Sequence, residues 1–279
     1  MNGRYIEMDY QETLMYGDVM AMAKKKLNDF TLDIAIGGSI NDKVVNSTRI
    51  DSKNASLKFA NVFNLANIVM SSSASIDQKI DAHYQLQSVF ATAQAGYKEG
   101  VFLDLTARND WSSTLAYTKY EKKGFFYPSI GVSFLPDKWV KMPEWVSFSK
   151  LRGAYSIVGN GVPPFITYPV SYVTAGGGML ASDAAPFAEM KPEMTHSVEL
   201  GMEWKFLQHR LGLNLTYYRT NTYEQFFKLP ALAGDKYAYR YVNAGDIQNQ
   251  GWEITLDATP VLTPDFTWKT SLNFSANKN

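Results

Sequence analysis

Segments of about ten residues, in which apolar and polar side chains alternate, recur along the chain. The connections between them are alternately short and long. Within 101–110, Val101 and Leu103 fall on one face, whereas Asp104 and Arg108 fall on the other. A period of two residues predicts a β-strand with one apolar and one polar face. The polar faces of the similar segments along the chain carry charged and amide side chains.

This alternation predicts strands at 29–40, 80–97, 101–110, 125–135, 146–158, 195–206, 210–221, 250–260 and 266–276, with a further strand within 1–17. Short connections are predicted at 98–100, 207–210 and 261–265, and the longer, aromatic connection at 136–145 belongs to the same side by its place in the order of strands. Long connections, rich in Ser, Asn, Gly, Pro and Tyr, are predicted at 41–79, 111–124, 159–194 and 222–249. The only pattern with helical spacing lies near 19–27 and predicts a helical turn.

A soluble sheet has no reason to keep its connections short on one side only, whereas an outer-membrane barrel has short periplasmic turns and long outer loops. The apolar faces also carry aromatic residues that we expect beside the turns: Tyr97, Trp204, Phe206, Trp252, Phe266 and Trp268. Such rings form girdles at the two surfaces of a bilayer. The sequence therefore predicts a transmembrane β-barrel.

Composition excludes several other classes of function. The 27 basic and 27 acidic residues give a formal net charge of +0, so nothing favours nucleic acid. The absence of cysteine excludes disulfides and thiolate sites. Gly176–Gly178 has no lysine nearby and is interpreted as a flexible loop tip rather than a phosphate-binding loop. No run of 18 apolar residues is present, so a spanning helix is not expected.

The first ten residues contain Arg4, Glu7 and Asp9 and have no apolar core of a secretory signal. An exported barrel needs such a signal. We therefore expect this sequence to be a piece of a longer chain, a hypothesis that sequencing the DNA on both sides of the reading frame would test.

Several segments are similar to one known family. They are Leu105–Thr114 (LTARNDWSST), Phe126–Phe134 (FYPSIGVSF), Leu151–Asn160 (LRGAYSIVGN), Lys191–Glu193 (KPE) and Asn243–Glu253 (NAGDIQNQGWE). In this order they resemble the barrel of SusC/RagA-type TonB-linked outer-membrane proteins, also called TonB-dependent receptors. The resemblance covers most of 80–279, and residues 1–79 fit it more loosely.

The resemblance implies an all-β, antiparallel transmembrane barrel of 22 strands, of which 1–279 would supply about ten. The family's plug domain is absent from this sequence, so 1–279 is interpreted as a partial barrel domain. The implied function is active import of nutrients such as oligosaccharides or peptides across the cell outer membrane. The implied partners are the TonB complex, acting through the plug, and a SusD-like surface lipoprotein. A passive porin would differ only in having no plug.

The charged residues of the polar faces are the first candidates for a functional wall. We expect them to face the barrel lumen, where they would contact the plug, line a substrate path, or simply hydrate the inner wall. They are Arg108, Asp110, Lys150, Arg152, Glu199, Glu203, Glu253, Asp257 and Lys269.

No catalytic, metal or cofactor site is predicted, and the chain is not expected to be an enzyme. Glu199 and Glu203 share a strand face, but four residues of strand separate them by about 13 Å. A glycosidase pair needs roughly 5 to 9.5 Å. His83, His196 and His209 are dispersed and are interpreted as wall or solvent residues rather than metal ligands.

Aromatic residues in the long connections are the second group of candidates. Such rings stack on sugars and bury large areas of a peptide, and they are equally suited to packing loops together. No single residue is assigned to ligand binding. The candidates are Tyr168, Tyr172, Tyr223, Phe226, Phe227, Tyr237, Tyr239 and Tyr241.

The alternative architecture is a soluble or surface-attached β-sandwich that binds carbohydrate or protein. Alternation alone does not separate it from a barrel, because both give each strand one apolar and one polar face. The two differ in where the apolar faces go. In a sandwich they pair into a closed core, whereas in a barrel they remain on the outside.

Overall fold

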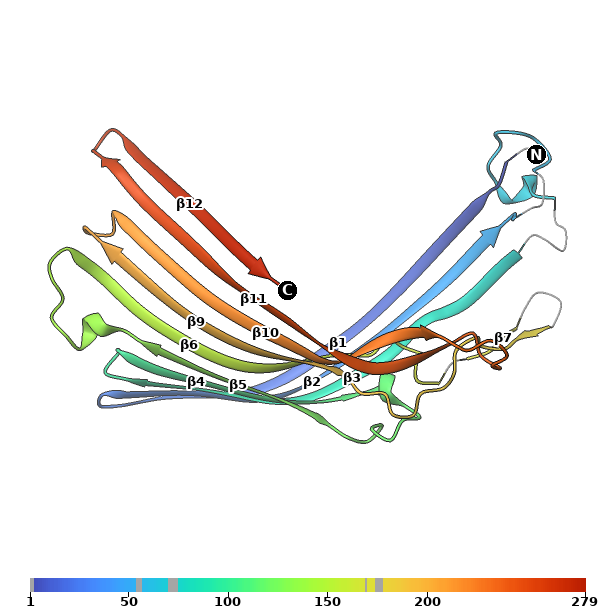
Figure 1. The fold of residues 1–279 in the computed structure, drawn as a ribbon, viewed down its shortest axis with the longest axis horizontal. Coiled ribbons are helices and arrows are strands. Elements are labelled where there is room, and N and C mark those ends of the chain that lie inside the picture. Colours follow the sequence, from blue (N-terminus) through green and yellow to red (C-terminus); the bar gives the residue numbers. More distant parts are fainter. Residues whose placement is uncertain (1–2, 54–56, 70–74, 169, 174–177) are drawn as a thin grey trace.

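The computed structural model describes residues 3–53, 57–69, 75–168, 170–173 and 178–279, and these form one large antiparallel sheet (Figure 1). Its ten strands follow one another in chain order. They are β1 (Ile6–Leu27), β2 (Phe30–Asp51), β3 (Ser75–Tyr97), β4 (Val101–Ser112), β5 (Phe125–Phe134), β6 (Val146–Asn160), β9 (Glu193–Phe206), β10 (Leu211–Pro230), β11 (Tyr239–Leu262) and β12 (Thr267–Lys278). The smaller elements are β7 (Tyr172–Val173), β8 (Met179–Leu180), η1 (Leu65–Asn67), η2 (Ser113–Leu115) and η3 (Pro136–Lys138).

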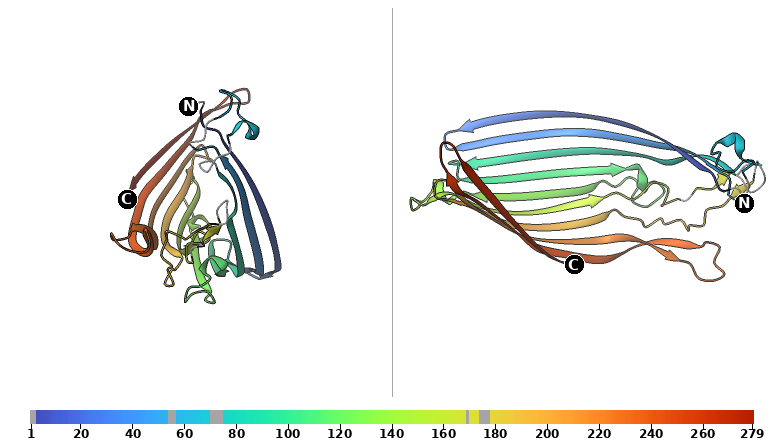
Figure 2. Two further views of the ribbon diagram at one scale, coloured as in Figure 1. Left: turned by 90° about the vertical axis from the view of Figure 1, so that its right-hand side faces the viewer. Right: turned by 90° about the horizontal axis from the view of Figure 1, so that it is seen from above.

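The sheet curves into an open trough, as its end-on view shows (Figure 2). All short connections lie at one end of the trough, on the left in Figure 1, and the long connections lie at the other. This confirms the predicted all-β, antiparallel, partial barrel of about ten strands. We call these the turn end and the loop end.

The register places most of the apolar side chains of the ten strands on one face. Cross-strand partners share a face of the sheet, and Ala93 of β3 pairs with Ile34 of β2 and with Leu105 of β4. On the far side of the sheet, Ile254 of β11 pairs in the same way with Leu215 and with Phe274. The other face carries the charged and polar residues.

The polar face is the concave one. Its side chains crowd together, so that Ser88 and Thr216 are only 4% and 9% exposed. On the apolar face Val89 and Leu200, one residue along from polar-face positions, are 52% and 55% exposed. Side chains converge on the inside of a curved sheet and spread apart on the outside.

Aromatic rings border the apolar face at both ends. At the turn end Tyr97 stacks on Phe30 with ring centroids 4.5 Å apart and meets Trp139 at 5.5 Å. At the other border Trp252 lies 4.8 Å from Tyr217. The sequence predicted that Trp252 lies beside a turn, and this is wrong. Trp252 lies about ten residues before the turn end of β11, at the loop-side edge of the apolar band, which is the part of the apolar face between the two aromatic borders.

Five strands are much longer than predicted. β1, β2, β3, β10 and β11 contain 22, 22, 23, 20 and 24 residues, whereas a bilayer needs about 9 to 11. The predicted loops at 41–79 and 222–249 are thus partly wrong, because 41–51, 75–79, 222–230 and 239–249 are strand. Beyond the apolar band both faces of the sheet are polar, so the sequence loses the alternation that reveals a strand.

The helical turn predicted near 19–27 is also wrong, because these residues complete β1. Their Met, Ala, Lys and Leu residues favour a helix in isolation. In the folded chain every residue from Val19 to Leu27 pairs with β2, and this sheet pairing overrides the local preference.

The β-sandwich alternative is wrong as well. A sandwich packs the apolar faces of two sheets together. In the described part of the chain the only second sheet is the two-stranded β7–β8 pair, and large apolar side chains of the main sheet such as Ile36 and Leu272 are 61% and 63% exposed. Among the described residues, no helix has the length and hydrophobicity needed to cross a membrane.

Glycine 37 allows a close approach on the concave face, and replacing it tests the register. A Cβ atom there would lie 2.7 Å from the Phe90 ring and 2.7 Å from the backbone oxygen of Val19. We expect Gly37→Ala to destabilise the assembled protein by about 1–3 kcal/mol in urea unfolding in detergent, because overpacking forces the backbone to shift. Gly17→Ala is the matched control, since its Cβ would meet only Ile40 at 3.8 Å. Equal stability of the two variants would contradict the register.

Candidate functional site

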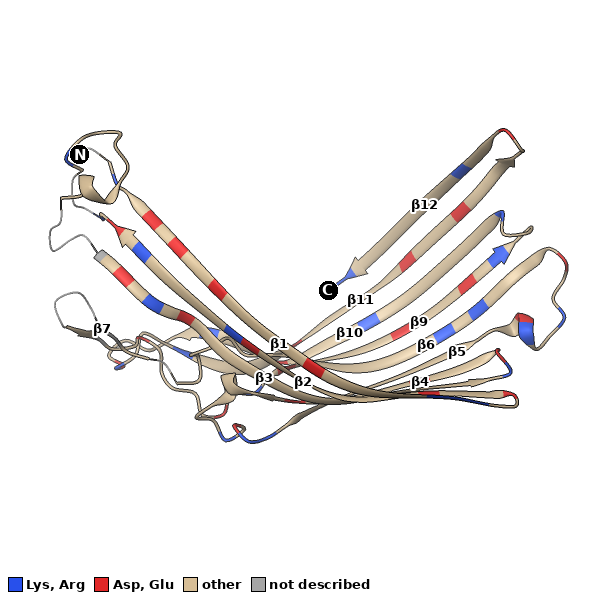
Figure 3. Ribbon diagram, turned by 180° about the vertical axis from the view of Figure 1, so that it is seen from behind, with Lys and Arg blue, Asp and Glu red and all other residues tan. Residues whose placement is uncertain are grey.

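The nine charged candidates predicted from the sequence lie on the concave face. The register aligns Arg152 with Thr216 and Glu253 through Gly201, and it aligns Lys150 with Glu203. Charges of both signs are spread along the strands rather than gathered in one patch (Figure 3).

Most of these charges are neutralised by a neighbour. The guanidinium of Arg152 donates to Glu199 at 3.2 Å and to the Thr216 hydroxyl at 2.6 Å. Lys205 lies 3.0 Å from Glu203. Glu199 and Glu203 thus each have a separate cationic partner, and their cross-strand partners are Ala154, Tyr218, Lys150 and Asn214 rather than acids. This arrangement gives a hydrated, electrically balanced wall.

The histidines are separate from one another. His83 lies 3.7 Å from Asp42, His196 shares a 2.8 Å hydrogen bond with the Tyr155 hydroxyl, and the His209 backbone N–H donates to Ser147. No cluster of three or more potential metal ligands is present in the part of the chain that the structure describes.

At the loop end, several long connections pack into one small core. Leu115, Val162, Ile166 and Met190 are buried there, surrounded by partly buried aromatic rings. The Thr167 hydroxyl donates to the backbone oxygen of Ala116 at 3.0 Å, which joins the connection after β6 to the one after β4. These connections therefore form one packed unit, which we call the loop core.

Asn243 of β11 ties the loop core to the sheet. Its side-chain amide donates to the backbone oxygens of Lys191 at 3.0 Å and Glu224 at 2.7 Å, and its side-chain oxygen accepts from the Lys191 N–H at 2.9 Å. The Lys191 ammonium contacts the Glu224 carboxylate at 2.7 Å, and this hydrogen bond raises the pKa of Lys191. Glu224 and Gly245 both have positive φ and lie opposite each other at a local interruption of the β10–β11 pairing, which keeps the same register on both sides.

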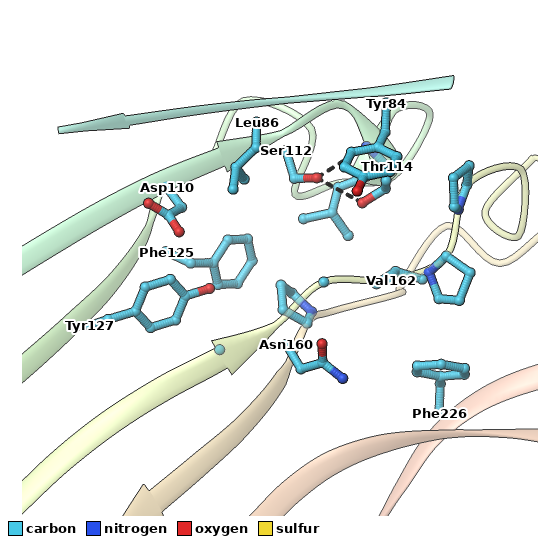
Figure 4. Close-up of a pocket in the computed structure, with 16 residues that line it drawn as sticks. Tyr84, Leu86, Asp110, Ser112, Thr114, Phe125, Tyr127, Asn160, Val162 and Phe226 are labelled. Atoms are coloured by element: carbon cyan, nitrogen blue, oxygen red, sulfur yellow. Dashed lines mark hydrogen bonds between the residues drawn. The ribbon is translucent and has the colours of Figure 1, made fainter. Parts of the chain in front are cut away.

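A pocket of about 480 Å³ opens between the concave wall and the loop core (Figure 4). One wall is apolar and includes Leu86, Leu115, Val162 and Phe226, together with three prolines. The polar groups converge from β3, β4, β5, β6 and the connection after β4. They are Tyr84, Asp110, Ser112, Thr114, Tyr127 and Asn160.

Arg108 and Asp110 link this pocket to the wall. The Arg108 guanidinium donates to Asp110 Oδ1 at 2.7 Å and to the Ser88 hydroxyl at 2.7 Å. Ser112 and Thr114 share a hydrogen bond of 2.8 Å. Asp110 is the only one of the nine predicted charged residues that lines the pocket.

The predicted loop aromatics have different positions. Phe226 lines the pocket, and Phe226 and Tyr241 pack against the loop core. The Tyr168 ring is tilted against Tyr117 with ring centroids 4.8 Å apart, and the rings of Tyr223 and His196 meet edge to face at 5.2 Å. Tyr239 lies under the ammonium of Lys228 and beside Tyr241, Lys236 lies over Tyr237, and Phe227 is 41% exposed. Tyr172 belongs to β7, while Gly176 and Gly177 lie outside the described residues.

Sequence reasoning missed most of the pocket and a second polar centre at the loop end of β1 and β2. The buried carboxylate of Asp51 accepts from Arg4 Nε at 2.8 Å and Nη2 at 2.7 Å, from Arg49 at 2.7 Å and from the Lys53 N–H at 2.8 Å. Hydrogen bonds from Arg4 hold the pKa of Asp51 well below its usual range, helped by Lys53 and Arg49 and opposed by burial. Arg4 and Asp51 are 47 residues apart, so no local pattern reveals the pair.

We expect the loop end of β1 and β2 to lose stability at acidic pH, because the Asp51 carboxylate holds it together. Because the pKa of Asp51 is lower in the folded state, its contribution to stability is complete above the unfolded carboxyl pKa and is lost as pH falls below about 4. We expect pepsin cleavage near Lys53 to accelerate from about pH 4 downward, measured against cleavage within 231–238. Asp51→Asn should be cleaved faster than the wild type at about pH 4, and this difference should shrink as pH falls, because the variant lacks the additional pH dependence. The same pH profile in both proteins would contradict the prediction.

Comparisons with known proteins identify the family of this sheet. The sequence model of the family described as TonB dependent receptor-like, beta-barrel, matches residues 8–278. The chain belongs to this family. TonB-dependent receptor barrels of this kind are outer-membrane proteins, so the apolar convex face is the surface that meets lipid.

Its relatives are considerably longer. TonB-dependent receptor P3 of Formosa agariphila is 29% identical over 205 residues, which are 70% of this chain and 20% of that protein. TonB-dependent receptor SusC of Bacteroides thetaiotaomicron is 27% identical over 185 residues, which are 61% of this chain and 18% of that protein. The chain thus spans about a fifth of the length of the curated relatives that it matches.

Solved structures share the fold. The RagAB peptide transporter superposes with a TM-score of 0.82 at 19% identity, over 98% of this chain and 30% of that one. The outer membrane transporter YddB from Escherichia coli superposes with a TM-score of 0.65 at 12% identity, over 98% and 34%. The curvature and strand order of the trough are therefore those of a segment of TonB-dependent receptor barrel wall.

Proposed function

We propose that this chain forms part of the wall of an outer-membrane importer for nutrients such as oligosaccharides or peptides. The observation that carries the proposal is the position of the pocket. It lies at the loop end of a concave wall whose charges are balanced, where a solute captured outside would enter the lumen. Residues 1–279 are the partial barrel domain in this proposal, and a plug, the TonB complex and a SusD-like lipoprotein complete the importer.

The similar proteins support the proposal that the chain belongs to an importer, without naming its substrate. One relative is named SusC, and one similar structure is a peptide transporter. Transport requires no covalent step, which agrees with a wall whose paired carboxylates serve as counter-ions. Catalysis is therefore not part of the proposed function.

Gene deletion tests the proposal. In the source organism, the gene for the full-length receptor is deleted, and growth is measured on single oligosaccharides and on defined peptide mixtures. We expect growth on one of these nutrients to be lost, to return with the wild-type gene, and to be lost also in a strain without TonB. Unchanged growth on every nutrient, or growth independent of TonB, would contradict an energised importer.

A further inference from the structure

We propose that the loop-end pocket binds the free amino terminus of a short peptide, with Asp110 accepting hydrogen bonds from its ammonium group. This inference rests on the proposed import function and names its substrate class. It depends on the Asp110 carboxylate, on the acceptor oxygens beside it and on the preformed apolar wall of the pocket.

The pocket has one charged lining residue. Asp110 Oδ1 accepts a hydrogen bond from the Arg108 guanidinium, whereas no described residue donates to Asp110 Oδ2. Figure 4 shows its carboxylate on the same side of the cavity as the rings of Phe125 and Tyr127. Arg108 itself does not line the pocket. A ligand group here therefore meets a carboxylate oxygen with no basic side chain in the lining, which favours a cation.

The other polar side chains are four hydroxyls and one amide, and each has an oxygen that can accept a hydrogen bond. The Asn160 amide donates to Glu193 at 3.2 Å, and this leaves its carbonyl oxygen for a ligand. Pro163, Pro164 and Pro192 have no backbone N–H to offer. An ammonium group is donor-only, with up to three N–H bonds to give. It can donate to several of these oxygens at once, and unlike a sugar hydroxyl it carries a positive charge that complements the Asp110 carboxylate.

The remaining wall fits an apolar side chain next to that amine. Leu86, Leu115, Val162 and Phe226 line it, and the cavity volume of about 480 Å³ lies within the usual range for small-ligand sites. Leu115 and Val162 also belong to the buried loop core, so the wall exists before the ligand arrives. A preformed wall lowers the entropic cost of binding. Together these features describe a site for the first residues of a peptide.

The test uses the full-length receptor in detergent and two pools of random tripeptide amides, one with free amino termini and one N-acetylated. Retained peptides are quantified by mass spectrometry. We expect the free-amine pool to be retained about tenfold more strongly or better, since hydrogen bonds to charged groups are the strong ones. This comparison uses the wild-type protein and does not depend on the folding of any variant.

Two variants localise the effect. Asp110→Asn keeps a side-chain oxygen for Arg108 but removes the charge, so the preference for free amines should disappear. Asp104→Asn is the control, because Asp104 lies on the same face of β4, accepts from Gln94 and does not line the pocket. The preference should survive in this control. Equal retention of both pools, no retention of either, or a preference that persists in Asp110→Asn would overturn the inference.

A third probe separates this inference from the importer proposal. Maltohexaose is offered to the same receptor, and the deletion strain is grown on maltohexaose and on the peptide pool. Binding of the sugar without any amine preference, together with growth that depends on the receptor, would overturn amine recognition while leaving the importer proposal intact. Amine-selective binding with unchanged growth of the deletion strain would contradict the importer proposal alone.

Discussion

Expressed alone, residues 1–279 should fail to give a folded monomer, either in detergent-free buffer or in the outer membrane. In the described structure β1 and β12 each pair with only one neighbour, so each leaves a row of backbone N–H and C=O groups unpaired. In lipid each such group costs several kcal/mol, and in water the open edges promote aggregation. The convex face adds a second problem in water, because between its aromatic borders it exposes many large apolar side chains.

The measurement is size-exclusion chromatography followed by urea unfolding of the isolated segment. Its control is the full-length receptor expressed in the same strain. We expect aggregate and no cooperative transition from the segment, and a heat-modifiable folded monomer from the control. A detergent-free monomer of residues 1–279 that unfolds cooperatively would show that the sheet closes on itself, and the trough would then not be a segment of barrel wall.

For every strand except β1, the sequence predicted the part that lies between the aromatic borders, because two solvents act on it there. Between the aromatic borders, lipid meets one face and water the other, so residues such as Leu213 and Asn214 must alternate. Beyond the loop-side border, both faces meet water and the alternation has no cause. The segment from Asn41 to Asp51 is therefore strand without a strand-like pattern, and its pairing with β1 and β3 supplies what the pattern lacks.

The pocket was largely unpredictable for a different reason. Its polar groups come from positions as far apart as Tyr84, Asp110 and Asn160, and the fold alone brings them together. Asp110 was identified as a wall residue because strand alternation reveals which face a residue occupies. Alternation does not reveal which loop will cover that face. Phe226 and Tyr241 illustrate the same point, since both were loop aromatics in sequence but lie in β10 and β11 and pack against the loop core.

Asn243→Ala should lower the free energy of local opening of the loop core by about 2–4 kcal/mol. This is the effect expected when three hydrogen bonds are lost and partly buried backbone groups are left unpaired. The Asn243 side chain holds Lys191 at both its N–H and its carbonyl, and holds the Glu224 carbonyl as well. The measurement is hydrogen exchange of the peptide spanning 186–192 in the intact receptor. We expect protection to fall there while amides within the apolar band of β9 and β10 keep theirs.

Two further variants show whether the effect belongs to this side chain. Asn221→Ala is the control, because Asn221 lies on neighbouring β10 and its side chain makes two exposed hydrogen bonds, to Asp246 and from Arg219, each at 3.2 Å. Asn243→Asp keeps the acceptor for the Lys191 N–H but loses both donors, so its protection should be intermediate. Equal protection in Asn243→Ala and Asn221→Ala would mean that the loop core is held by its apolar contacts alone.

The three hydrogen bonds of Asn243 to Lys191 and Glu224, which we call the clamp, lie close enough to the pocket to affect binding. Pro192 and Phe226, which line the pocket, lie one and two residues from the clamped Lys191 and Glu224. Freeing the clamp lets this wall move, so a ligand must order it again on binding, and affinity should fall although Asn243 does not line the pocket. Asn243→Ala should therefore weaken the retention of free-amine and acetylated peptides by the same factor, whereas Asp110→Asn removes only the difference between them. If Asn243→Ala changed the amine preference itself, the division between a charge that selects the ligand and a clamp that preforms its site would be wrong.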